Sequence, residues 1–258
     1  MRLLSFDTSA REITAAILIG GQVLAFERIV FEADLEVKGS GKKVSRQESV
    51  SLLLPTIDRL LKDNNVAKGE LDGLAVGIGP GGFTGIRVAV TTARTIAQAL
   101  ERPLVGINSL EAASYGEPSE KNAGVIKHAS ASHCYMAIYK RVFSDSSKSG
   151  AAAEFDLGAV LEPSYVKYEE IGSRLTLAPC WYAEQAVLKK LEGAAANLCE
   201  LPAVTNVAAI QAKLAYLRLS LKGANQGSFP FRQVEPLYLR GASVTLKKGD
   251  AVERIESN

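Results

Sequence analysis

The sequence is poor in the residues that most often bind metals or form covalent links, with two histidines and three cysteines in 258 residues. The histidines, His128 and His133, lack the helical i, i+4 spacing of a metal-binding pair, so we expect no metal site there. The cysteines, Cys134, Cys180 and Cys199, lie far apart and without paired spacing. This argues against a disulfide framework or a zinc ribbon and suits a reducing cytosol.

An excess of charge of either sign is also missing, since 30 basic residues oppose 28 acidic ones. A formal net charge of +2 gives no global electrostatic case for nucleic-acid binding, which usually shows a basic domain or stripe. No apolar run reaches the ~18 residues of a membrane span. The apolar start at 3–6 passes directly into Asp7, so we expect no signal peptide. These absences predict a cytoplasmic protein without membrane contact.

What the sequence does contain is a glycine-rich stretch at 77–87, Gly-Ile-Gly-Pro-Gly-Gly-Phe-Thr-Gly-Ile-Arg. It follows an apolar run at 74–76 that predicts a buried strand, and it leads into a helical pattern that ends at Leu100. Backbone N–H groups at such a turn can face an anion. A tight turn in which only glycine tolerates positive φ is the plainer alternative. A dinucleotide-binding pattern would need an acidic residue about 20 positions later, where the chain has Asn108-Ser109.

Three strands are predicted before this stretch, at 3–9, 13–19 and 23–30. Gly20-Gly21 is a hairpin turn signal between the last two. A charged loop is expected at 33–45.

Two helices are predicted in this half of the chain. Apolar residues at helical spacing predict a helix over 50–61 whose buried face is Val50, Leu53, Leu54, Ile57, Leu60 and Leu61. Pro55 interrupts this pattern, so either the helix bends there or Pro55 lies in its first turn. The second helix, 83–100, carries a stripe of small residues, Gly85, Ala89, Ala93 and Ala97. This stripe suits close packing on the chain's own sheet or the approach of another backbone.

The pattern starts again after a junction at 106–109. Strands are expected at 124–127, 134–142 and 175–178, a linker at 144–153, and a short helix at 184–191. Asn206 is a predicted cap of a last long helix that ends at Gly223 and buries Ile210, Leu214, Leu217 and Leu221. Two successive runs of strands and helices indicate a duplicated α/β architecture.

Residues 79–87 resemble the Gly-Pro-Gly-Ser-Phe-Thr-Gly-hydrophobic-Arg signature of the TsaB family, with Gly82 in place of the serine. Further similar segments lie at 4–9, 53–57, 105–111 and 235–240, and the similarity is thin between 116 and 202. The family provides dimerisation subunits of the bacterial tRNA threonylcarbamoyladenosine machinery.

The resemblance implies a two-lobed actin-like ATPase or sugar-kinase fold of ribonuclease H-like type, in which a duplicated mixed β-sheet is flanked by helices. We expect an N-terminal lobe at 1–106 joined by a returning helix at 204–223, a C-terminal lobe at 107–203, and a C-terminal tail at 224–258.

Active members of this fold hold ATP on phosphate loops, and the equivalent groups here look degenerate. The candidate loop residues are Asp7, Thr8, Ser9, Gly79, Gly81 and Gly82. The first loop keeps a carboxylate and hydroxyls but no glycine, and Arg11 and Glu12 would crowd it. Residues 178–181 replace a Gly-Asp-Gly turn of relatives, and no Walker pattern occurs. We therefore expect no cofactor, no catalytic residue and no ATP turnover by this chain alone.

The resemblance implies a non-catalytic subunit that supports threonylcarbamoyl transfer to N6 of the adenosine 3′ of the anticodon in tRNAs reading ANN codons. Its expected partner is the catalytic paralogue TsaD, with tRNA reached indirectly through the complex. Association with the ATPase TsaE and a homodimer in isolation stay open. The alternatives are a small-molecule kinase or ATPase that uses Asp7 and residues 79–82, and a peptidase, for which no nucleophile motif is present.

By resemblance, helices 50–61 and 83–100 form a bundle with the equivalent helices of the partner. The expected contact residues are Leu52, Thr56, Thr84, Arg87, Val88, Thr91, Thr92 and Thr95. Leu52 and Thr56 are expected to lie off the buried stripe of the first helix.

Overall fold

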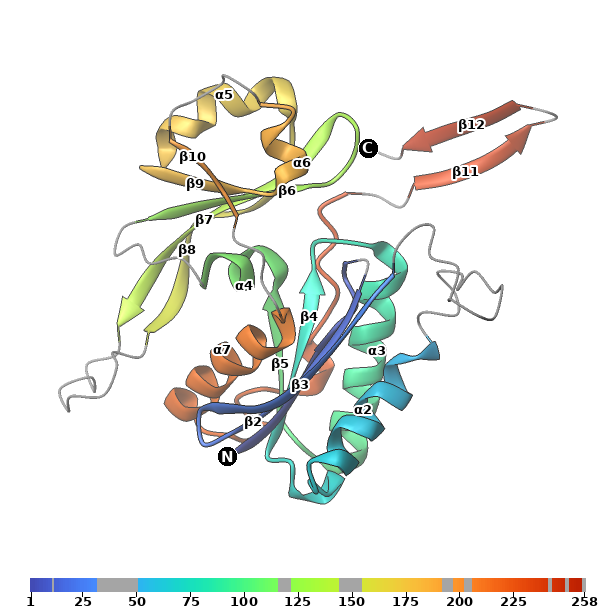
Figure 1. Ribbon diagram of the computed structural model, residues 1–258, viewed down its shortest axis with the longest axis vertical. Helices are drawn as coiled ribbons and strands as arrows, with labels where there is room; N and C mark the ends of the chain where they lie inside the picture. Colours follow the sequence, from blue (N-terminus) through green and yellow to red (C-terminus); the bar gives the residue numbers. More distant parts are fainter. Residues whose placement is uncertain are drawn as a thin grey trace.

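The computed structural model describes most of the chain. It covers residues 1–10, 12–31, 51–115, 122–143, 155–191, 197–201 and 206–240, and the backbone of 243–248 and 251–256. The loop expected at 33–45 and the linker expected at 144–153 lie outside these residues, as do Arg11 and Val50. Within them the chain forms two five-stranded sheets and a two-stranded hairpin (Figure 1).

The first sheet has the strand order β3-β2-β1-β4-β5. Its strands are β1 (Arg2–Asp7), β2 (Glu12–Ile19), β3 (Gln22–Val30), β4 (Gly73–Gly79) and β5 (Leu104–Asn108). The first three pair antiparallel, whereas β4 is parallel to both β1 and β5. Gly20 and Gly21, both at positive φ, form the turn between β2 and β3, which confirms the predicted hairpin.

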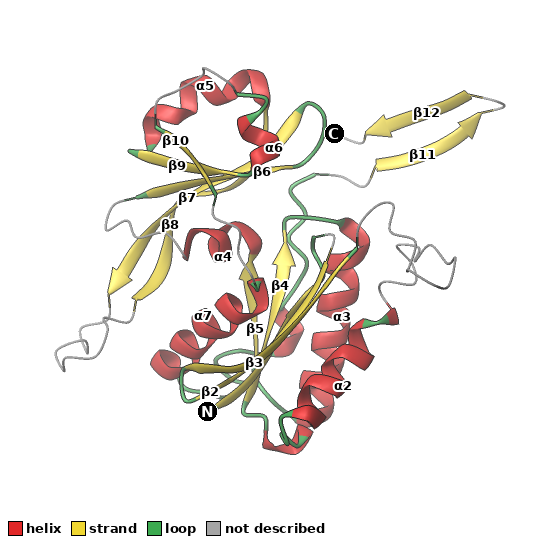
Figure 2. Ribbon diagram, viewed as in Figure 1, coloured by secondary structure: helices red, strands yellow, loops and turns green. Residues whose placement is uncertain are grey.

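Helices cover both faces of this sheet (Figure 2). Helices α2 (Leu53–Asp63) and α3 (Phe83–Leu100) pack on one face, and α7 (Val207–Lys222) packs on the other. Ala89, Ala93 and Ala97 of α3 are fully buried in the core beneath the first face. The predicted small-residue stripe therefore packs on this chain's own sheet.

The second sheet repeats the first, in the order β8-β7-β6-β9-β10. Its strands are β6 (Ala123–His128), β7 (His133–Phe143), β8 (Phe155–Lys167), β9 (Cys180–Ala183) and β10 (Leu198–Glu200). As in the first sheet, three antiparallel strands are followed by two parallel ones. This repetition confirms the duplicated α/β architecture.

Shorter elements complete the chain. They are the helices α4 (Ser109–Tyr115), α5 (Ile171–Arg174) and α6 (Gln185–Leu188), the 3-10 turns η1 (Lys68–Glu70), η2 (Tyr168–Glu170), η3 (Leu175–Leu177) and η4 (Phe231–Gln233), and the hairpin strands β11 (Ser243–Lys248) and β12 (Ala251–Glu256). The strand expected at 175–178 is wrong. Leu175 and Ala178 are both buried, and their i, i+3 spacing fits the 3-10 turn found there. None of the helices in the described residues is long and apolar enough to cross a membrane.

Two details of α2 correct the sequence analysis. Pro55 lies in the first turn, where its missing N–H costs no helical hydrogen bond, so the second of the two expected arrangements is confirmed. Leu54, expected in the core, is 57% exposed, whereas Thr56, expected off the buried stripe, is 2% exposed. The Thr56 hydroxyl donates to the Leu52 carbonyl at 2.7 Å, and this bond satisfies the buried hydroxyl.

Helix α7 has the predicted ends. Asn206 Oδ1 accepts a hydrogen bond from the Ala209 amide at 2.9 Å, and the chain turns at Gly223 with φ of 85°. Leu221 was expected in the core but is exposed. The buried face is instead Ala208, Gln211, Ala212, Leu214, Ala215, Leu217 and Leu219.

Candidate functional site

The Asp7–Ser9 turn and the glycine stretch meet at one edge of the first sheet. Strands β1 and β4 run parallel, with Phe6 opposite Val76, so their carboxyl ends lie side by side. β1 ends at Asp7 and β4 ends at Gly79, where the chain turns into α3. The structure thus brings together the two segments that phosphate binding would require.

The Asp7 carboxylate is buried and already has protein donors on both oxygens. Oδ1 accepts from the Ser9 amide at 2.6 Å, and Oδ2 accepts from Nε2 of Gln211 at 2.6 Å. Gln211 is fully buried on α7, so this contact ties the returning helix to the end of β1. A Cβ at Gly77 would lie 1.7 Å from Oδ2 of Asp7, so the residue under the carboxylate must be glycine.

The glycines at the start of α3 allow the backbone of the Asp7–Ser9 turn to come close to the helix. A Cβ at Gly81 would lie 2.4 Å from the Ser9 carbonyl oxygen, and a Cβ at Gly85 would lie 1.9 Å from the Thr8 carbonyl oxygen. The Gly82 amide donates to the Ser9 carbonyl at 2.6 Å. The Thr8 hydroxyl donates to the Gly85 carbonyl at 2.6 Å.

The backbone angles and these contacts give a physical reason for three of the glycines in the stretch. Between residues 77 and 87, only Gly79 has positive φ, at 94°. The tight-turn alternative therefore explains one glycine, and close approach of the 8–9 backbone explains Gly81 and Gly85. Glu12, expected to crowd the turn, instead pairs with Arg28 on β3 at 2.8 Å.

The histidines make local contacts within the second lobe. His128 Nδ1 lies 2.9 Å from the Tyr168 hydroxyl. The His133 ring stacks on Tyr165, with ring centroids 4.3 Å apart. Among the described residues, no group of three or more His, Cys, Asp or Glu side chains could hold a metal ion.

An apolar cavity of about 550 Å³ lies where α2 and α3 meet. Its walls are Leu4, Leu54, Pro55, Ile57, Asp58, Leu61, Lys68, Leu71, Ile96 and Leu100. The exposed side chain of Leu54, which was expected in the core, forms part of its wall. Leu52, which was expected as a contact residue, is exposed. Sequence spacing missed Leu54 because it assigned this residue to the core.

The outward flank of α3 carries most of the expected contact residues. Thr84, Arg87, Thr91 and Thr95 are exposed, as expected for a contact surface. Val88 and Thr92 are only partly exposed, and Val88 packs against the core. Replacing these two residues would therefore disturb the monomer as well as any contact.

The C-terminal segment reinforces the start of α3, which the sequence did not reveal. The Leu237 amide donates to the Ile78 carbonyl at 2.8 Å. The Tyr238 ring lies 4.8 Å from the Phe83 ring, and Arg87 covers the same ring at 5.3 Å. Both aromatic rings are exposed in part. They extend the α3 flank into an amphipathic surface.

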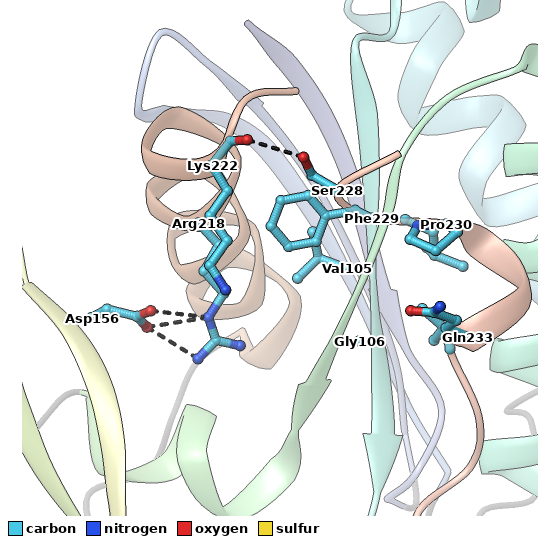
Figure 3. Close-up of a pocket in the computed structure, with 11 residues that line it drawn as sticks. Val105, Gly106, Asp156, Arg218, Lys222, Ser228, Phe229, Pro230 and Gln233 are labelled. Atoms are coloured by element: carbon cyan, nitrogen blue, oxygen red, sulfur yellow. Dashed lines mark hydrogen bonds and ion pairs between the residues drawn. The ribbon is translucent and has the colours of Figure 1, made fainter. Parts of the chain in front are cut away.

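A second cavity, of about 400 Å³, lies between β5, α7 and the 228–234 segment (Figure 3). Arg218 of α7 and Asp156 of β8 form an ion pair on its wall, and Arg218 also pairs with Glu111 of α4. Burial raises the pKa of the Glu111 carboxyl, and the Arg218 cation lowers it in part. Arg218 therefore joins the first sheet's returning helix to elements of the second lobe.

Comparisons with known proteins agree with this architecture. The sequence profile of the tRNA N6-adenosine threonylcarbamoyltransferase (TsaD) family matches residues 42–247. The transferase of Clostridium novyi is 26% identical over 113 residues, which cover 43% of this chain and 33% of that protein. The transferase of Methylorubrum extorquens (strain PA1) is 32% identical over 118 residues, which cover 43% and 34%. This chain thus spans about a third of the length of the curated relatives it matches.

Two solved structures from Pseudomonas aeruginosa show the same fold. YeaZ aligns with a TM-score of 0.67 and 22% identity, over 92% of this chain and 99% of that one. A protein described as similar to peptidase YeaZ aligns with a TM-score of 0.66 and 21% identity, over 93% and 99%. With the duplicated sheets, this establishes the two-lobed actin-like fold that the resemblance implied.

Proposed function

Because this chain belongs to the tRNA N6-adenosine threonylcarbamoyltransferase (TsaD) family, we propose that it is the TsaB-like, non-catalytic subunit of a threonylcarbamoyl-transfer system. In this function it supports transfer to N6 of the adenosine 3′ of the anticodon in tRNAs reading ANN codons. Its partner is the catalytic paralogue TsaD, and tRNA is reached through the complex. The ATPase TsaE is a further candidate member, and a homodimer is the state proposed for the isolated chain.

The observation that carries this proposal is the closed contact between the Asp7–Ser9 turn and the start of α3. A phosphate-binding loop must offer its backbone N–H groups to the ligand. Here the Ser9 and Gly82 amides are bonded within the protein, and the spaces beside Gly81 and Gly85 hold the backbone of the first turn. The kinase or ATPase alternative would need these two segments to separate.

We propose that TsaD docks on the α2–α3 surface, defined here as Leu52, Leu54, Thr84, Arg87, Thr91 and Thr95. Thr56 leaves this set because it is buried, and Val88 and Thr92 remain only at its inner edge. Leu54 on the wall of an apolar cavity, the exposed Leu52 and a set of α3 residues in which only Arg87 is charged suit a buried helix–helix contact. A stable interface buries about 800 Å² per partner, and two adjacent helices can supply much of that.

Further proposals follow from the same interpretation. The lobes divide near residue 106, with residues 107–203 as the second lobe, the helix of 204–223 returning to the first, and residues 224–258 as a tail. The chain acts in the cytoplasm.

Deletion of the gene tests the function. Loss of the threonylcarbamoylated nucleoside, measured by mass spectrometry of tRNA digests, is expected. Complementation with Asp7→Asn then tests the non-catalytic role, because the amide keeps the shape of the carboxylate and removes its charge. Modification near the wild-type level is expected. A loss of 100-fold or more, with the variant folded and bound to TsaD, would assign Asp7 to the chemistry.

A paired substitution tests the surface. Thr91→Glu with Thr95→Glu places two charges on exposed positions of α3, so the monomer should stay folded while co-purification with TsaD falls at least tenfold. Thr176→Glu is the matched control, an exposed threonine on the second lobe. Binding of TsaD by the double variant with wild-type affinity would show that the interface lies elsewhere.

A further inference from the structure

Two cysteines that are 19 positions apart in sequence meet on the second sheet. The Sγ atoms of Cys180 and Cys199 lie 3.7 Å apart. This is about 1.6 Å more than the ~2.05 Å of a disulfide bond. Cys199 is opposite Tyr182 and so lies two residues away from Cys180 in register, which places the two Cα atoms roughly 8 Å apart, and bond formation therefore requires a shift of β10 along β9.

The strand register explains why both thiols lie on one face. Strands β9 and β10 pair in parallel, with Trp181 opposite Leu198 and Tyr182 opposite Cys199. Because side chains alternate along a strand, Cys180 shares the face of Tyr182, and Cys199 projects to that face from the neighbouring strand. Trp181 points the other way and is fully buried. The two thiols therefore lie on the face opposite to Trp181, where β10 forms the edge of the sheet.

Access and freedom to move favour chemistry at this pair. Cys180 is partly exposed and Cys199 is exposed. β10 is a three-residue strand at the edge of its sheet, so it pairs on one side only. In contrast, Cys134 is fully buried, and burial raises the pKa of its thiol to about 12. Reactivity requires an accessible thiolate, so the chain holds one accessible pair and one inert thiol.

We propose that Cys180 and Cys199 form a redox-active dithiol that is oxidised reversibly by small-molecule disulfides of the glutathione type. This proposal goes beyond the proposed function and does not depend on it. Cys199, the more exposed thiol, loses its proton to solvent and attacks the disulfide, and one thiol leaves. The Cys180 thiolate then attacks Cys199 Sγ and expels the second thiol. Two protein thiols lose two electrons in total, and one small disulfide becomes two thiols.

Peptide mapping of the full-length chain tests the pair. The reduced protein is treated with glutathione disulfide, its remaining thiols are alkylated in denaturant, and the digest is analysed without reduction. We expect a cross-linked pair of peptides containing Cys180 and Cys199, lighter by two hydrogens than their sum and released by dithiothreitol. The oxidised chain should also melt a few degrees higher, because the cross-link restricts the unfolded state.

Single substitutions give the controls. In Cys180→Ser and in Cys199→Ser, checked for folding by circular dichroism, the remaining thiol of the pair should keep a glutathione adduct. Cys134→Ala should form the same cross-link as the wild type. The proposal is overturned if the wild type stays fully reduced. It is equally overturned by a stable glutathione adduct without a cross-link, by a link to Cys134, or by a link between two chains.

Discussion

Gly85 offers a direct test of how the glycine stretch is held closed. A methyl group at this position would meet the Thr8 carbonyl oxygen at 1.9 Å, whereas an ordinary contact needs 3.4 Å or more. Either the start of α3 or the Thr8 backbone must therefore move by roughly 1.5 Å, since the obstructing atom belongs to the main chain. Overpacking of this kind costs about 1–3 kcal/mol.

Two smaller effects adjust the expected change in the free energy of unfolding. Movement also weakens the bond from the Thr8 hydroxyl to the Gly85 carbonyl, which is worth about 1 kcal/mol. Alanine has a higher helix propensity than glycine, which stabilises the folded state by about 1 kcal/mol and offsets this loss. We therefore expect Gly85→Ala to decrease the free energy of unfolding by about 1–3 kcal/mol, which lowers the melting temperature by roughly 3–10 °C in a protein of this size.

Gly172→Ala is the matched control for this measurement. Gly172 also lies in a helix, α5, but a Cβ there would meet nothing within 4 Å. The propensity gain acts alone at this position, so stability should rise by about 0.5–1 kcal/mol. Urea denaturation followed by circular dichroism gives both values. Equal midpoints for Gly85→Ala and the wild type would refute the close contact between Thr8 and α3.

Three further substitutions test other parts of the structure. Arg218→Met leaves Glu111 and Asp156 without their shared cation and should cost about 3–5 kcal/mol in thermal unfolding at neutral pH. Burial raises the pKa of Glu111 and the Arg218 cation lowers it in part, so removal of the cation raises this pKa further. Protonation of Glu111 then relieves the unpaired charge, so the loss of stability should shrink as the pH falls, and a loss that grows would contradict this reasoning. Leu54→Ser should change the free energy of unfolding of the monomer by no more than about 0.5 kcal/mol, because Leu54 is exposed, and it should weaken TsaD binding at least tenfold in a titration. Leu177, on the second lobe, is exposed to a similar extent, so Leu177→Ser is the control and should leave binding unchanged. Asn206→Ala removes the N-terminal cap of α7 and the hydrogen bond from the Asn206 side-chain amide to the Glu27 carbonyl. Chemical denaturation should therefore show a decrease of about 1–3 kcal/mol in the free energy of unfolding, and a decrease below about 0.5 kcal/mol would contradict the cap.

The local features of the fold were predictable because they depend on neighbouring residues. Alternating strands joined by Gly20-Gly21 define a hairpin without help from the rest of the chain. Asn206 and Gly223 mark the ends of α7 through bonds and backbone angles within a few residues. For α2 the sequence allowed either a bend at Pro55 or a helix that begins just before it. The helix begins at Leu53, which places Pro55 in the first turn, where its missing N–H is not needed.

Features that depend on distant contacts were not predictable. Leu54 and Thr56 are both compatible with the helical spacing, and their burial depends on the angle at which α2 meets the sheet. Strand β8 was missed because Gly158 and Pro163 weaken its pattern, although the antiparallel pairing with β7 is long. The proximity of Cys180 and Cys199 arises from the pairing of β9 with β10, which the 19-residue separation conceals.

The closed turn and the proposed partner surface meet at the start of α3, where residues of the two alternate along the chain. Gly85 receives the Thr8 backbone on its inner side, and its neighbours Thr84 and Arg87 lie on the exposed flank of α3. Phe83 anchors the same turn against Tyr238 of the C-terminal segment. A nucleotide entering between Ser9 and Gly81 would have to push this turn outward and displace the flank. In the proposed non-catalytic role, one set of contacts therefore both holds the start of α3 in place and fills the space that a phosphate group needs.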